Sequence, residues 1–207
     1  MQLSSFKKIF KISNKNHLRN RKGRIEVASK SHPIVIGVRK IRNRPKKILE
    51  IGCSTGFILE RIRQLTNANC FGLDTSAMAI KEGKKIFPKL RLFHGEFSSH
   101  KLNKKKYDLI IFGFFLFMVP PKDVFELFSK AHNSLKENGH IIIYDFKSKK
   151  NLIKKNYKYS KFVKVHKWDF KKVFLALPSY KIIFSQKKFF DKKFAETELS
   201  VIKKVKI

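Results

Sequence analysis

Short apolar segments alternate with amphipathic segments between residues 46 and 146, and this alternation constrains the fold more than any other feature. Five apolar runs have the length of buried strands, at 47–51, 69–73, 90–93, 107–112 and 141–146. Helical spacing of apolar residues occupies three of the intervals between them, at 56–65, 76–87 and 121–135. Strands joined by helices form a mostly parallel sheet covered on both faces. The pattern therefore predicts a doubly wound α/β fold.

The segments on either side of this alternation complete the predicted domain. Residues 1–45 are expected to be a basic arm or short helices that pack on the domain, and residues 46–207 a single domain. A helical pattern at 169–177 and strand-like segments at 180–185 and 198–205 predict a sheet completed by an antiparallel edge. In the helix at 121–135, which Gly139 is expected to follow as a breaker, five residues are predicted to face inward: Val124, Phe125, Leu127, Phe128 and Ala131.

The turn after the first predicted strand indicates a ligand site. Glycines at Gly52 and Gly56 let a ligand approach the backbone closely, and the helix that follows offers free N–H groups. A dinucleotide motif would also need glycine where Ser54 and Phe57 stand. Asp74 follows the next strand, where an acid can accept hydrogen bonds from both hydroxyls of a ribose. The glycine-containing turn after one strand and the acid after the next strand together predict a nucleoside-binding site.

These motifs resemble those of the class I S-adenosylmethionine-dependent methyltransferases. The family's acid-x-Gly-x-Gly-x-Gly motif is matched from Glu50 to Gly56, with Ser54 in place of the middle glycine. Asp74 matches the ribose-binding acid, and Gly95-Glu96 resembles the Gly-Asp step that contacts adenine. Residues 107–111 and 135–140 resemble the family's later motifs, with His140 in place of a second glycine. The resemblance covers about residues 46–146 and implies a Rossmann-like fold with S-adenosylmethionine as cofactor.

The resemblance also implies which residues contact the cofactor. This expected set is Glu50, Gly52, Cys53, Ser54, Gly56, Asp74, Thr75, Glu96, Phe97 and Gly113. Two departures from the family pattern bear on it, since Ser54 adds a hydroxyl to the turn and Glu96 is one methylene longer than aspartate.

The acceptor of the methyl group is narrowed by two missing motifs. The Asn/Asp-Pro-Pro-Tyr/Phe motif of exocyclic amine methylation is absent after the fourth strand, which reads Gly113-Phe114-Phe115-Leu116. Neither Cys53 nor Cys70 is placed as the nucleophile that carbon methylation requires. These absences leave an oxygen or a nitrogen as the methylated atom, and they favour O-methylation of a small-molecule or saccharide acceptor. An RNA methyltransferase and a non-catalytic cofactor-binding protein are the alternatives.

No catalytic residue is assigned from the sequence. Three aromatic residues and a methionine after the fourth strand are candidates for an acceptor pocket: Phe114, Phe115, Phe117 and Met118. Candidates for a general base are His94, His100, His140, His166 and Tyr144.

The net charge of +33 is carried by the two ends of the chain. Residues 1–47 contribute +14, residues 48–146 only +4, and residues 147–207 contribute +15. Two interpretations stay open, namely the amino-acid bias of an A+T-rich genome and attraction to a polyanion such as RNA.

Cysteine content and apolar run lengths bear on location and partners. Two cysteines are too few for a disulfide framework or a zinc site, so no metal is expected. The longest apolar run, 109–119, is far shorter than the ~20 residues that span a bilayer. A cytoplasmic protein without membrane insertion is expected, and no pattern indicates an oligomeric state.

Overall fold

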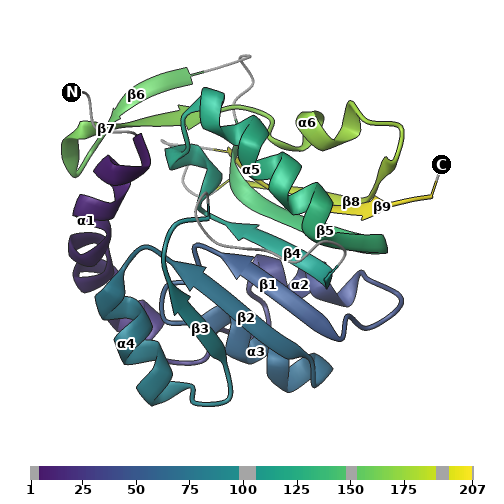
Figure 1. Ribbon diagram of the computed structural model, residues 1–207, viewed down its shortest axis with the longest axis horizontal. Helices are drawn as coiled ribbons and strands as arrows, with labels where there is room; N and C mark the ends of the chain where they lie inside the picture. Colours follow the sequence, from purple (N-terminus) through teal and green to yellow (C-terminus); the bar gives the residue numbers. More distant parts are fainter. Residues whose placement is uncertain (1–4, 98–105, 148–152, 190–195, 207) are drawn as a thin grey trace.

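The computed structural model describes residues 5–97, 106–147, 153–189 and 196–206. A seven-stranded sheet with the strand order β3-β2-β1-β4-β5-β9-β8 forms its centre (Figure 1). Its strands are β1 (Lys47–Ile51), β2 (Asn69–Asp74), β3 (Arg91–His94), β4 (Tyr107–Gly113), β5 (Leu135–Lys147), β8 (Tyr180–Phe189) and β9 (Glu196–Lys204). β1 to β5 run parallel, whereas β9 pairs antiparallel with both β5 and β8. The predicted α/β fold with an antiparallel edge is confirmed.

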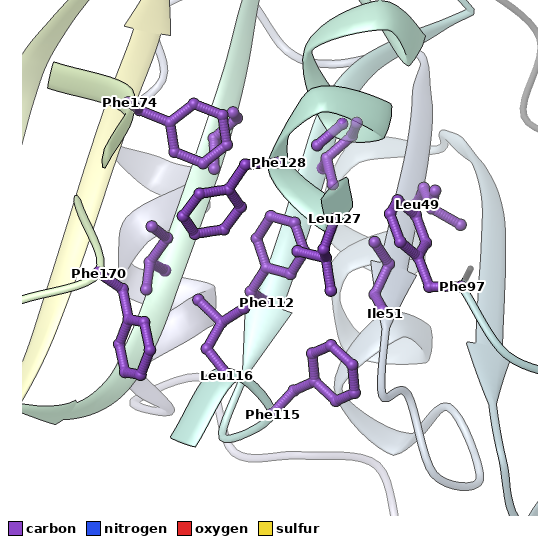
Figure 2. Packing of buried hydrophobic residues seen from close by; sticks show 14 of the residues in the cluster. Leu49, Ile51, Phe97, Phe112, Phe115, Leu116, Leu127, Phe128, Phe170 and Phe174 are labelled. Atoms are coloured by element: carbon purple, nitrogen blue, oxygen red, sulfur yellow. The ribbon is translucent and has the colours of Figure 1, made fainter. Parts of the chain in front are cut away.

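Helices cover both faces of the sheet because alternate strand residues point to opposite sides. Their bounds are α1 (Ser5–Asn20), α2 (Pro33–Arg39), α3 (Phe57–Thr66), α4 (Ala77–Ile86), α5 (Pro121–Ser134) and α6 (Lys171–Leu175), with short 3-10 helices η1 (Arg21–Arg24) and η2 (Leu116–Met118). Ile48 packs with α2 and α3, whereas its neighbour Leu49 belongs to the cluster under α5. In that cluster the rings of Phe112, Phe128 and Phe174 follow one another from β4 through α5 to α6 (Figure 2).

Two details of α5 differ from the sequence prediction. Phe125 is 63% exposed, because its position on the helix turns away from the sheet that Val124 and Phe128 contact. The strand β5 already begins at Leu135, so Gly139 lies inside a strand and does not follow a helix. Asn138, with φ at +61°, lies in the irregular step of the pairing with β4, where Leu135 is opposite Tyr107 but His140 is opposite Leu109.

A hairpin outside the main sheet was not anticipated from the sequence. Strands β6 (Ile153–Tyr157) and β7 (Ser160–Lys167) pair antiparallel and lie beside α1 (Figure 1). α1 itself packs on α4, where His17 Nε2 lies 3.0 Å from Glu82 Oε2. Segments from the two ends of the chain therefore meet on the same side of the fold.

Candidate functional site

A cavity of about 490 Å³ opens at the carboxyl ends of β1, β2 and β4. From β1 the chain adds β2 and β3 on one side of the sheet, and it then crosses back to place β4 on the other side of β1. The boundary between β1 and β4 is therefore the switch point of the sheet. Open α/β sheets bind ligands in the crevice at this switch point, because loops on either side diverge and leave a gap. The predicted strand-end turns thus border a cavity of the size that small-molecule sites have.

The turn after β1 is held in a conformation that suits small residues. Gly52, Ser54 and Gly56 all have positive φ angles, at +79°, +54° and +86°. The N–H groups of Gly52 and Cys53 both donate to the Leu73 carbonyl, at 2.8 and 3.2 Å. A Cβ built on Gly52 would lie 3.1 Å from the Phe115 side chain, so a larger residue there would displace Phe115 and close part of the cavity.

Asp74 joins this turn to the end of β2. Its two carboxylate oxygens accept the backbone N–H groups of Ser54 and Ser76, each at 2.8 Å. Burial raises the pKa of Asp74, while the two N–H donors oppose that shift. Each oxygen keeps a further lone pair for a ligand hydroxyl, since a carboxylate oxygen accepts about two hydrogen bonds.

Glu50 is a buried acid that lines the cavity at the end of β1. Its side chain is 1% exposed, and Oε2 has no hydrogen-bond partner among the described residues. Burial raises the pKa of Glu50 to about 8, with the nearby Asp74 adding to the shift and Arg24 opposing it. A buried acceptor without a partner is costly, so this oxygen is suited to a cationic or hydrogen-bonding group of a ligand.

The structure brings together seven of the ten residues expected at the cofactor. Those that line the cavity are Glu50, Gly52, Ser54, Asp74, Thr75, Phe97 and Gly113. The other three lie outside the lining. Cys53 is buried against Gly72, Gly56 caps the start of α3, and Gly95 lines the cavity in place of Glu96.

The N-terminal arm forms a wall of the cavity that the sequence motifs did not indicate. Arg24 Nη1 lies 3.3 Å from Ser54 Oγ, and the Arg24 carbonyl accepts the Thr55 hydroxyl, so η1 is anchored to the turn after β1. Burial lowers the pKa of Arg24. The Ser13 hydroxyl donates to the Thr75 carbonyl at 2.9 Å, which attaches α1 to the turn after β2. The local sequence of residues 1–24 shows only a weak helical pattern and carries no signal for these contacts.

A contact between α1 and the β6–β7 hairpin is part of the cavity wall. Arg19 Nη2 donates to the Tyr157 hydroxyl at 3.0 Å, and its guanidinium carbon lies 3.5 Å from the centre of the Tyr159 ring. Tyr157 Oη also lies 3.4 Å from Asn16 Oδ1. The hydrogen bond to Tyr157 and the cation–π contact with Tyr159 connect α1 to the hairpin, and Arg19 and Tyr157 are 138 residues apart in the chain.

Aromatic side chains also line the cavity. The ring centre of Phe146 lies 5.2 Å from that of Phe114 and 5.1 Å from that of Phe117, and all three rings line the cavity. Asp145 fixes the turn that carries them, because its buried carboxylate accepts the N–H groups of Phe115, Phe117 and Phe146 at 3.1, 3.2 and 2.7 Å. Phe114 and Phe117 therefore line the cavity, as do Phe115 and Met118, and their role in an acceptor pocket stays a prediction.

None of the described candidates for a general base lines this cavity. His94 and Tyr144 are absent from its wall, His140 lines a different cavity, His166 is buried elsewhere, and His100 lies outside the described residues.

His32, which was not among the candidates, does line it. Its Nδ1 accepts the Ile34 N–H at 3.3 Å, and burial lowers its pKa to about 4. At neutral pH His32 is therefore uncharged with its proton on Nε2, which makes that nitrogen a hydrogen-bond donor.

Two further searches of the described residues bear on the kind of site. No group of three or more His, Cys, Asp or Glu side chains is arranged to hold a metal ion in that part of the chain. Among the described helices, none is long and apolar enough to cross a membrane.

Comparison with known proteins gives one family match. Residues 48–139 match the family model described as a methyltransferase domain. No curated protein matches the chain.

Solved structures share the fold at low sequence identity. A S-adenosylmethionine-dependent methyltransferase from Methanosarcina mazei is 15% identical, with a TM-score of 0.68 over 84% of this chain and 98% of that one. The 1,6-didemethyltoxoflavin-N1-methyltransferase of Burkholderia thailandensis, solved with 1,6-didemethyltoxoflavin and S-adenosylhomocysteine bound, is 11% identical, with a TM-score of 0.73 over 100% and 93%. A TehB-like methyltransferase from Corynebacterium glutamicum is 16% identical, with a TM-score of 0.62 over 93% and 98%.

Proposed function

We propose that this chain is a class I S-adenosylmethionine-dependent methyltransferase, in line with its family match over residues 48–139 and its fold, and that it methylates a small aromatic acceptor on an oxygen atom. The observation that carries the proposal is the aromatic-lined cavity that adjoins the turns after β1 and β2. Its volume of about 490 Å³ is in the range of small-molecule sites, which agrees with a small acceptor bound beside the cofactor.

The residues that line the cavity fit the cofactor. At the amino-acid end of the cofactor, the unpartnered Glu50 Oε2 offers a hydrogen-bonding site to the ammonium group, and the partly buried Arg24 offers a positive charge to the carboxylate. Asp74 is proposed to receive the ribose hydroxyls with the acceptor capacity that its two N–H bonds leave free. S-adenosylmethionine, when bound, supplies a methyl group on a sulfonium that is already activated for displacement.

The protein's own contribution is then to position the acceptor and to exclude water. Alignment of the two reactants in one site accounts for a large part of the rate enhancement. Their translational and rotational freedom is already lost on binding, so it does not have to be lost in the reaction step. Phe114, Phe117 and Phe146 offer faces and edges on which a flat ring can stack. The contact of Arg19 with Tyr157 and Tyr159 forms part of the wall of the site.

The state of His32 favours an acceptor that is already nucleophilic. A neutral imidazole that donates from Nε2 cannot remove a proton, yet it can hydrogen-bond a phenolate or carboxylate oxygen. A saccharide hydroxyl would need a base. None of the described candidates from the sequence lines the cavity, and His17, which does, has its Nε2 engaged with Glu82 at 3.0 Å. An ionised oxygen on an aromatic ring therefore agrees best with the lining.

Nitrogen is the second candidate for the methylated atom. The Burkholderia enzyme of similar fold is named for methylation at N1 of a small heteroaromatic compound. A ring nitrogen with a free lone pair also needs no base, so the same lining suits it.

The proposal is tested with purified protein, isotopically labelled S-adenosylmethionine, and a panel of phenols, aromatic carboxylates, nitrogen heterocycles, monosaccharides and total RNA. Label transfer to an aromatic oxygen supports the proposal, and His32→Phe is expected to raise KM about tenfold by removing one hydrogen-bond donor. Transfer only to a nitrogen heterocycle would select the second candidate. Transfer only to saccharides or RNA would overturn both.

A further inference from the structure

A second cavity, of about 820 Å³, lies at the opposite edge of the sheet from the cofactor site. It is bordered by Pro45 and Lys46, which precede β1, and by Asp108 near the start of β4. Gly52 lies at the other end of β1, roughly 17 Å away for a five-residue strand. The two cavities are therefore separate sites.

The second cavity is lined mainly by positive charge. Six cations contribute to its wall: Lys40, Arg42, Arg44, Lys46, Lys181 and Lys203. Its two carboxylates are already engaged, since Asp108 accepts the Lys136 ammonium at 2.9 Å and Glu137 that of Lys204 at 3.2 Å. Neither of these partners is one of the six, so the cavity keeps a large excess of positive charge. A concave surface of one sign concentrates the field and attracts counter-ions.

One wall is a short segment whose exposed cations are flanked by buried residues. Ile41 and Pro45 are buried, whereas Lys40, Arg42 and Arg44 are exposed and line the cavity. The Lys46 N–H donates to Asp108 Oδ2 at 3.0 Å and fixes the end of this segment. The backbone is thus held in place, and its charged side chains are directed toward one space.

The facing wall places like charges next to each other. Lys181 of β8 and Lys203 of β9 are direct partners in the antiparallel register, and Lys203 is in turn opposite His140 of β5. Two lysines directly opposite across an antiparallel pair destabilise a sheet. Because the fold carries this cost beside four further cations, an anion bound there would relieve it.

We propose that this second cavity binds an anion with several closely spaced phosphate groups. Arg42 and Arg44 can each hold a phosphate through two parallel hydrogen bonds, and the lysines supply additional charge. A free oligophosphate and the phosphodiester backbone of an RNA strand present this same chemistry. The site is independent of the methyl-transfer reaction.

The test measures binding of two probes, inorganic tripolyphosphate and a 12-nucleotide oligouridylate, by titration calorimetry in 100 mM salt. Arg42→Gln with Arg44→Gln removes two exposed cations from the cavity. Lys85→Gln with Lys122→Gln is the matched control, since it removes the same charge from exposed positions on α4 and α5. Affinity for S-adenosylhomocysteine and the unfolding temperature check that each variant is folded.

The proposal expects at least one probe to bind with one dominant site, and the arginine variant to bind it at least tenfold more weakly than the control. Binding of tripolyphosphate identifies a free oligophosphate as a sufficient ligand, whereas binding of oligouridylate alone identifies the RNA backbone. The proposal is overturned if neither probe binds below millimolar concentration, or if the two variants lose affinity equally.

Discussion

Replacement of Glu50 by glutamine is expected to stabilise the free protein in a pH-dependent way. The folded-state pKa of Glu50 is raised by burial from 4.5 to about 8. Between these two values the folded protein holds a proton that the unfolded chain releases. The free energy of unfolding therefore falls as the pH rises through this window, and glutamine, which does not titrate, avoids the loss.

The size of the effect follows from the difference between the two pKa values. At pH 7 the unfolded carboxyl is 2.5 units above its pKa of 4.5, which corresponds to about 3 kcal/mol at most. Structural relaxation near Arg24 reduces this, so an increase of about 1–3 kcal/mol in the free energy of unfolding is expected for Glu50→Gln. At pH 5 the difference should fall to about a quarter of its value at pH 7.

The assay is denaturant unfolding of wild type and variant at pH 5, 6, 7 and 8, without cofactor. Glu60→Gln is a control of opposite sign, since Arg63 lowers the pKa of Glu60 through hydrogen bonds at 2.8 Å. That variant should be less stable than wild type by a nearly constant amount at all four pH values, because the contribution of a lowered carboxyl pKa is lost only below about pH 4.5. A Glu50→Gln variant whose advantage does not grow between pH 5 and 8 would refute the assignment of a raised pKa.

Three further predictions test the site and its walls. Asp74→Ala should weaken S-adenosylhomocysteine binding at least tenfold in calorimetry, and unchanged affinity would contradict the ribose assignment. Gly83→Ala should lower the unfolding temperature by about 2–4 °C or more, because its Cβ would clash with the Thr55 carbonyl oxygen, whereas Gly23→Ala has open space and should not. Arg19→Ala should speed hydrogen exchange in α1 and the β6–β7 hairpin with little change in unfolding temperature, and unchanged exchange would contradict the role of this contact in connecting the two segments.

Local sequence patterns were sufficient for the parts of the site that follow strands directly. The turn at Gly52 and the acid at Asp74 each stand at the end of an apolar run, so a parallel sheet must bring them to one edge. The exposed Phe125 shows the limit of the same reasoning, since helical spacing allows a broad apolar stripe and the packing partner decides its width.

The sequence by itself determined the sheet, its helices, the turn after β1 and the acid after β2, because strand alternation and turn chemistry act between neighbouring residues. Only the tertiary structure decided which segments meet over the carboxyl ends of β1, β2 and β4. It also decided that the cations around Arg42 and Lys203 line the same second cavity. Arg19 and Tyr157 are 138 residues apart, and β9 lies between β5 and β8. Such contacts depend on how whole elements pack, and no local pattern encodes them.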